Sequence, residues 1–209
     1  MEFEVRFYFP IEEYNKWFNI LNGFKDLTSA GRKYEIKSQY NHPMKDFDFY
    51  SKEIDGRFRV RLTKGEINSK CKVSWKRRLK DTTDTNINKE EEVEIIIKED
   101  EYKNLIFLLE NVLHLEKVES YERYRTIFEN EEIEIVLDEY PFGLAMEIEA
   151  KTDDDKAEKI IDKYMNLLNL SYANCYRLSW DDKYLELCQE QWFECYKIVE
   201  FNKPMPKVK

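Results

Sequence analysis

The chain has 209 residues, of which 42% are hydrophobic, and a formal net charge of −9. This length and apolar content predict a single folded domain with a core of its own. The negative charge argues against general binding to nucleic acid or to an anionic membrane. No apolar run approaches the ~18 residues of a membrane span, and the chain begins with charged alternation, so we expect neither a transmembrane helix nor a signal peptide.

Several residue types are too sparse or too irregular for common kinds of site. Two histidines exclude a multi-histidine metal site, and the four cysteines form no CxxC pair and no regular framework. A reduced, cytoplasmic setting therefore fits best. None of the five glycines forms a GxxxxGK loop or a GxGxxG turn, so any phosphate must be held by side chains.

Strand-like patterns occur five times in the first half of the chain. These predicted strands span residues 1–9, 34–40, 46–52, 57–62 and 70–78. Pro10 favours the start of a helix after the first strand, because proline fits the first helical turn. Asp55-Gly56 is typical of a two-residue hairpin turn.

The second half of the chain combines strands with helices. We expect strands at residues 90–95, 118–128, 133–138 and 144–149, and helices at about 100–112, 153–168 and 179–199. The three aspartates 153–155 favour a helix start, since carboxylates cap free N–H groups. Residues 179–182 resemble a capping box. The last helix is expected to bury Leu185, Cys188, Trp192, Cys195 and Val199, and the tail beyond it to be frayed.

The hairpin of residues 133–150 is the stretch around which the other elements can be organised. Because side chains alternate along a strand, Asp138, Glu147 and Glu149 should project to one side and the aliphatic residues to the other. Three carboxylates on one patch repel each other unless something positive lies among them. This pattern is a first indication of a metal ion.

Six of the predicted segments share an apolar face and a face of full charges. For any single strand this pattern is typical of an antiparallel sheet with one face in solvent. Taken together, the paired arginines and paired carboxylates also allow a barrel with the charges inside and the aliphatic faces outward under helices. Such an interior is stable only if cations and anions are placed against one another and against a ligand.

The charged residues also follow the order of a known family. Glu2-x-Glu4-x-Arg6 resembles the N-terminal ExExK signature of the CYTH, or triphosphate tunnel metalloenzyme, superfamily, with arginine in place of lysine. The positions that follow in the family's order are Arg59, Arg61, Lys76, Glu92, Glu94, Arg123, Arg125, Asp138, Glu147 and Glu149. The likeness runs from residue 2 to about residue 150.

This resemblance implies a fold and a domain plan. The implied class is α+β, with a closed eight-stranded antiparallel β-barrel, the triphosphate tunnel, and helices packed outside it. We expect one CYTH-like domain over residues 1–209, with the barrel core at 1–170 and a C-terminal helical extension at 171–209.

The resemblance also implies the residues of the site. Binding of Mg²⁺ or Mn²⁺ is expected at Glu2, Glu4, Asp138, Glu147 and Glu149, with Asp138 either a ligand or the orienter of a basic residue; Glu92 and Glu94 are further candidates. Phosphate binding is expected at Arg6, Arg59, Arg61, Lys76, Arg123 and Arg125. A direct part in catalysis is expected for Glu4, Arg59, Arg61, Lys76 and Arg125.

The implied activity is metal-dependent hydrolysis of tripolyphosphate, thiamine triphosphate or a nucleoside triphosphate, with release of orthophosphate. One alternative is a class IV-type adenylate cyclase that makes cyclic AMP and pyrophosphate from ATP. Another is a non-catalytic protein that binds polyphosphate or a triphosphate. RNA 5′-triphosphatase activity is a related option, favoured by the basic run 70–80 and disfavoured by the net charge. We expect a small-molecule triphosphate as partner, no membrane, and a monomer or homodimer.

Overall fold

The computed structural model describes residues 3–47, 56–65, 69–78, 90–152 and 156–209. The chain divides into two compact units. The first unit contains Lys33–Glu122 and Lys197–Val199, and the second contains Glu2–Arg32, Arg123–Tyr196 and Glu200–Lys209. The long strands β2 (Thr28–Asn41) and β6 (Glu116–Glu129) belong in part to each unit.

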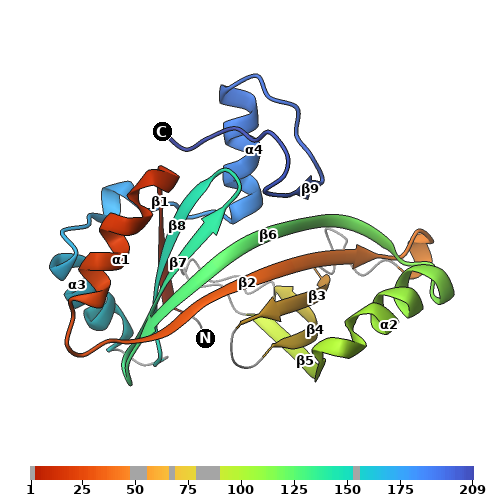
Figure 1. The fold of residues 1–209 in the computed structure, drawn as a ribbon, viewed down its shortest axis with the longest axis horizontal. Helices are drawn as coiled ribbons and strands as arrows, with labels where there is room; N and C mark the ends of the chain where they lie inside the picture. The colour runs from red at the N-terminus through yellow and green to blue at the C-terminus, as the bar shows by residue number, and fades with distance from the viewer. Residues whose placement is uncertain (1–2, 48–55, 66–68, 79–89, 153–155) are drawn as a thin grey trace. The chain divides into compact units, whose positions relative to one another are not determined.

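Among the described residues, the other regular elements are seven more strands and four helices (Figure 1). The strands are β1 (Phe3–Phe9), β3 (Gly56–Lys64), β4 (Lys70–Arg78), β5 (Glu90–Lys98), β7 (Ile133–Tyr140), β8 (Gly143–Ala150) and β9 (Ile198–Val199). The helices are α1 (Tyr14–Asn22), α2 (Tyr102–Phe107), α3 (Ala157–Leu167) and α4 (Trp180–Glu190). Short 3₁₀ or π turns occupy Ile11–Glu13, Lys45–Phe47, Glu99–Glu101, Leu108–Val112 and Tyr172–Asn174.

The strands form one antiparallel sheet in the order β1-β8-β7-β6-β2-β3-β4-β5, and β9 joins β6 in parallel. This arrangement confirms the predicted α+β class. The strand pairs of the described residues do not include one between β1 and β5, so closure into a barrel stays a prediction. In the part of the chain that the structure describes, no helix is long and apolar enough to span a membrane.

In the second unit, α1 and α3 cover the apolar face of β1, β8 and β7 (Figure 1). Alternation puts Phe7 of β1 and Met146 of β8 on this face, where they meet Leu21 of α1 and Tyr164 of α3. All four side chains are buried. Each such side chain contributes roughly 1.5–3 kcal/mol relative to its exposed state. The opposite face of the same strands carries the charges.

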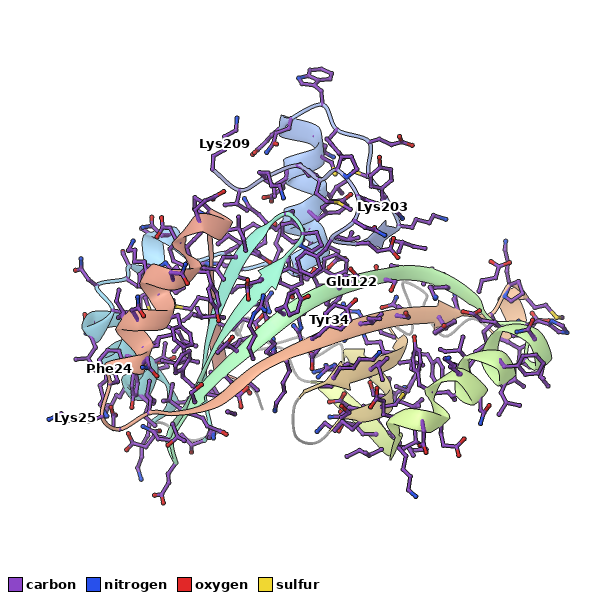
Figure 2. The ribbon with its side chains drawn as sticks, in the orientation of Figure 1. Phe24, Lys25, Tyr34, Glu122, Lys203 and Lys209 are labelled. Carbon is purple, nitrogen blue, oxygen red and sulfur yellow. The ribbon has the colours of Figure 1, made fainter. Side chains whose placement is uncertain are left out.

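The first unit repeats this division between faces. The apolar sides of β2, β3 and β4 pack under α2 and the turn after it, around Tyr40, Val60, Cys71 and Leu109. Their opposite sides are charged or polar. Tyr34 of β2, on the same side of the strand as Tyr40, donates a hydrogen bond to the Glu122 carboxylate of β6 at 2.6 Å, and the two residues lie side by side in Figure 2.

Some predicted elements differ from the structure or lie outside the described residues. The strand predicted at 46–52 is wrong at its start, because Asp46 and Phe47 lie in a 3₁₀ turn; residues 48–52 are outside the described part. Gly56 begins β3. Its expected turn partner Asp55 and the three aspartates 153–155 lie outside the described residues.

The predicted last helix is too long. Its capping box at Ser179 and Asp182 is present, but α4 ends at Glu190 and Val199 lies in β9. Trp192 adopts φ 54°, which a right-handed helix does not accommodate, and its side chain is 95% exposed. The expected burial of Trp192 is therefore wrong, as is that of Leu185 and Cys195, whereas the expected burial of Cys188 and Val199 is confirmed.

The C-terminal tail is ordered by specific contacts, so the expected fraying is wrong as well. The Val208 N–H donates to the Phe142 carbonyl oxygen at 2.9 Å, and the Lys207 ammonium donates to the Pro141 carbonyl oxygen at 2.6 Å. Gln191 exchanges two hydrogen bonds with the Lys207 backbone. The tail is thereby fixed to the turn between β7 and β8.

Gly143 tests how closely this tail must fit. A Cβ at this position would lie 2.6 Å from Val208 Cγ2 and 3.2 Å from the Phe9 carbonyl oxygen. We expect Gly143→Ala to lower the free energy of unfolding by about 1–3 kcal/mol, as overpacking does. In urea denaturation, adding Val208→Ala should recover part of that loss. Strictly additive costs would contradict the close fit.

Candidate functional site

The second unit carries a charged face built from four neighbouring strands. Glu4 of β1 lies opposite Glu149 of β8, and Arg6 lies opposite Glu147. Directly opposed residues of an antiparallel pair share a face, so all four side chains project to the same side. Asp138 of β7 and Arg125 of β6 are also opposed, and Arg125 reaches Glu147.

Arg6 is held in three directions. Its Nε donates to Glu147 at 2.7 Å, its Nη2 to Glu4 at 3.0 Å, and its Nη1 to the Leu178 carbonyl oxygen at 2.9 Å. A guanidinium has five N–H donors in a planar fork. Fixing three of them orients the plane of the fork and leaves donors for an anion. Arg6 is thus an oriented cation on the charged face.

Asp138 lies at the centre of the same face and is fully buried, with 0% exposure. Arg123 donates to its Oδ2 at 2.9 Å, and Arg125 donates to both of its oxygens at 2.7 and 2.5 Å. Arg123 also donates to the Tyr140 hydroxyl at 3.3 Å. These bonds favour the second of the two predicted roles for Asp138, the orientation of basic residues.

Glu147 shows which effect wins in this network. Burial raises its pKa, but attraction to Arg6, Arg125 and Arg123 outweighs burial and lowers the pKa from 4.5 to about 2. Attraction to Glu147 and other carboxylates likewise raises the pKa of Arg6 and of Arg125 against the opposing effect of burial. The positive charge that the sequence required among its carboxylates is therefore supplied here by arginines.

The donor chemistry of this face fits a hard divalent cation, which prefers carboxylate oxygens. Glu4 and Glu149 are opposed across β1 and β8, and Glu134 of β7 lies opposite Glu149 on its other side. Within the described residues, however, no group of three His, Cys, Asp or Glu side chains is already arranged to hold a metal. Glu2 lies outside those residues. A metal bound here would be held by Glu4 and Glu149, with Glu147 beside them.

The first unit has a charged face of its own. Arg57, Arg59 and Arg61 of β3 share this face with Lys72 and Lys76 of β4. The register of β5 puts Glu94 opposite Ser74 and Glu92 opposite Lys76. Lys72 donates to both oxygens of Glu94 at 2.6 Å, whereas Lys76 and Glu92 are 4.0 Å apart. Glu92 and Glu94 therefore lie on the charged face, whereas Glu91, opposite Arg77, lies on the other face.

Two arginines of this face, Arg59 and Arg61, are partly buried. The Nε of Arg61 is buried and has no hydrogen-bond partner in the described part of the chain. Burial lowers the pKa of Arg59, and the neighbouring Arg57 and Arg61 lower it further, although Tyr121 and Glu119 oppose them. Burying part of a cation costs free energy unless an anion is placed against it. The charge of this face therefore suits an anion.

The predicted site residues divide between the units. The second unit contains Glu4, Arg6, Arg123, Arg125, Asp138, Glu147 and Glu149, and the first contains Arg59, Arg61, Lys76, Glu92 and Glu94. Direct contacts join most of the second set. The sequence analysis did not name Glu134 as a candidate, although strand alternation places it on the same face as Asp138. It also missed the Leu178 carbonyl group, for which no side-chain signal exists.

With this geometry established, comparison with known proteins assigns the chain to a class. The sequence matches the CYTH domain family over residues 1–174, and the chain therefore belongs to that family. Enzymes of this family depend on a divalent metal and act on small triphosphates. Comparison with curated protein sequences gives no match. The predicted domain boundary near residue 170 stays a prediction.

Solved structures share the fold. A protein from Pyrococcus horikoshii is 24% identical with a TM-score of 0.61, over 91% of this chain and 99% of that one. A candidate adenylate cyclase from Vibrio parahaemolyticus is 16% identical with a TM-score of 0.61, over 87% and 95%. HpAC1 from Hippeastrum, described as having a dominant triphosphatase activity, is 14% identical with a TM-score of 0.60, over 93% and 98%. At these identities the likeness shows the fold.

Neutralising Glu147 should weaken the folded protein. Glu147→Gln leaves Arg6 and Arg125 with less opposite charge in a half-buried network, so we expect the free energy of unfolding to fall by about 3 kcal/mol. Glu132→Gln is the control, because its pair with Lys163 is about half exposed, with side-chain exposures of 54% and 50%. It should cost under about 1 kcal/mol.

The same variant should change the response to acid. The pKa of Glu147 is lower in the folded chain, about 2, than its ordinary value of 4.5, so its stabilising contribution is complete above pH 4.5 and is lost as the pH falls towards 2. Urea denaturation at several pH values should show a shallower acid loss for Glu147→Gln than for the wild type. Parallel curves would contradict the assignment.

Proposed function

We propose that this chain hydrolyses a small-molecule triphosphate with the help of Mg²⁺ or Mn²⁺ and releases orthophosphate. The observation that carries the proposal is the set of oriented arginines interleaved with carboxylates on the second unit's charged face. Arginine forks match phosphate oxygens, and carboxylates match hard cations, so this combination suits a metal-bound polyphosphate. Family membership supports the same substrate class.

Four residues of the second unit's charged face have defined parts in this proposal. Arg6 and Arg125 offer their remaining N–H donors to phosphate oxygens, where negative charge grows in a loose transition state. Asp138 and Glu147 keep these forks in place. Because the pKa of Glu147 is about 2, this carboxylate stays ionised and orients arginines instead of accepting a proton at neutral pH.

The charged face of the first unit has a part of its own in the proposal. Arg59, Arg61 and Lys76 take the phosphate-binding role that the family resemblance implies, supported by the buried Nε of Arg61, which has no hydrogen-bond partner among the described residues. Glu4 and Glu149, with Glu2, are the proposed metal-binding carboxylates. A bound divalent metal would neutralise charge on the phosphate oxygens.

We prefer hydrolysis to cyclisation because of one protein that shares the fold. HpAC1, which shares the fold, is described as having a dominant triphosphatase activity although it is a cyclase candidate. The cyclase reading remains the second candidate, favoured by the Vibrio parahaemolyticus protein described as a candidate adenylate cyclase. In that reaction the same arginines would position ATP for attack by its own 3′-oxygen on the α-phosphorus.

A product screen separates these reactions. The protein is incubated with tripolyphosphate, thiamine triphosphate or ATP, with Mg²⁺, with Mn²⁺ or with EDTA. We expect orthophosphate release that EDTA abolishes. Cyclic AMP and pyrophosphate from ATP would instead establish the cyclase, and binding without turnover would establish the non-catalytic alternative.

Arginine variants test whether the charged face acts through oriented forks. Arg125→Ala removes a cation bonded to two carboxylates and should lower kcat/KM by about 30-fold or more, equivalent to roughly 2 kcal/mol or more. Arg125→Lys should recover only part, because it keeps the charge and loses the fork.

The matched control is Arg77→Ala in the first unit. Arg77 is half-exposed, pairs with the exposed Glu91 and lies over the Trp75 ring. Its loss should change kcat/KM by less than about 5-fold and in a salt-dependent manner. Similar small, salt-sensitive losses in Arg125→Ala and Arg77→Ala would mean that arginines only attract the substrate from outside.

A further inference from the structure

The C-terminal extension reaches directly into the charged face of the second unit. Residues 175–209 lie beyond the part of the chain that matches the family. Within them, the Tyr176 N–H donates to the Arg6 carbonyl oxygen at 2.8 Å, which ties the extension to the backbone of β1. Trp180 stacks on Tyr140 with ring centroids 6.2 Å apart and planes 11° apart. Residues 176–180 are therefore fixed at both ends against β1 and β7.

A single peptide group in this segment links a carboxylate to Arg6. The carbonyl of the Leu178–Ser179 peptide accepts from Arg6 Nη1 at 2.9 Å, and the N–H of the same peptide donates to Asp182 Oδ2 at 3.0 Å. The same oxygen of Asp182 also accepts from the Ser179 hydroxyl at 2.7 Å. The peptide plane is thus held from both sides.

In this chain of bonds, the Asp182 carboxylate acts on the peptide, and the peptide acts on the Arg6 guanidinium. A carboxylate that accepts from a peptide N–H polarises the peptide and makes its carbonyl oxygen a better acceptor. It also fixes the angle at which that oxygen meets the guanidinium. Arg6 has carboxylates at Nε and Nη2, so the peptide oxygen is its one uncharged partner in the described structure.

We propose that Asp182 is a positioning residue for Arg6, acting through the Leu178–Ser179 peptide, and that the extension thereby tunes the affinity of the second unit for the triphosphate. The inference rests on the proposed function, since it gives Arg6 a phosphate to bind. Asp182 touches no part of the substrate in this account. It acts by holding the fork of Arg6 in the orientation in which its free donors can meet phosphate oxygens.

The chain offers a matched pair of variants. Asp181 and Asp182 both lie in the first turn of α4, where a carboxylate interacts favourably with the helix dipole, but the hydrogen bond of Asp181 in the described structure is with the Ser179 hydroxyl and not with the peptide N–H. Calorimetric titration with tripolyphosphate in EDTA, in which the proposed hydrolysis does not proceed, should give a dissociation constant about 3- to 10-fold higher for Asp182→Ala, the range expected for one lost hydrogen bond. Asp181→Ala should stay within about 2-fold, and Asp182→Asn should recover most of the affinity because its amide oxygen can still accept.

A double mutant with Arg6 distinguishes a positioning role of Asp182 from a purely structural one. In an Arg6→Lys background, Asp182→Ala should cause little further loss, because the fork that it positions is gone. Additive losses, or equal losses for Asp181→Ala and Asp182→Ala, would overturn the proposal.

A measurement without substrate separates this inference from the proposed function. In ¹⁵N NMR of the free protein, Asp182→Ala should speed rotation of the Arg6 Nη1 group, and Asp181→Ala should not. If the NMR effect is present and tripolyphosphate does not bind the wild type, the proposed function fails while the positioning role stands. Unchanged Arg6 signals in Asp182→Ala would overturn the positioning role itself.

Discussion

The structure of the second unit depends on charges that are buried together. Asp138 is fully enclosed, and Arg123 beside it is only 4% exposed. Neither would be stable alone, since an unpaired buried charge costs several kcal/mol. Each is tolerated because Arg123 and Arg125 surround Asp138 while Glu147 joins Arg125 to Arg6. The strand register makes this possible by placing opposite charges at opposed or diagonal positions of β1, β8, β7 and β6.

Such a network favours geometry over net stability. A buried ion pair often contributes no more than a well-packed hydrophobic pair of similar volume, but removal of one member is strongly destabilising. The guanidinium planes of Arg6 and Arg125 are therefore fixed before any ligand arrives. A preorganised donor needs little reorganisation when charge develops on a phosphate, which is how oriented groups stabilise a transition state. The face is better suited to anion recognition than to holding the sheet together.

The sequence predicted the strands well where alternation was strict. The period of two in residues 133–150 gave the two faces of β7 and β8, because one face is buried and the other charged. It could not show which partner each carboxylate takes, since an aspartate accepts equally from an arginine or a metal, and so Asp138 was open to both roles. The early part of β2 was missed because all five residues of Thr28–Arg32 are exposed and show no alternation of apolar and polar side chains. The length of the last helix was overestimated because Trp192 has a left-handed backbone, which the sequence does not indicate at an aromatic residue.

The extension shows why part of a site escapes any reading of side-chain patterns. The group that meets Arg6 is the Leu178 backbone carbonyl, and the Leu178 side chain itself is 54% exposed. Any residue could supply that oxygen; what places it is the capping box of α4 and the anchoring of the tail on the turn after β7. A helix cap usually stabilises only its own helix, but the peptide group in this cap also accepts a hydrogen bond from Arg6 on the charged face. One peptide group makes both bonds: its N–H donates to Asp182 at the start of α4, and its carbonyl oxygen accepts from Arg6. A change in one of these bonds therefore alters the other.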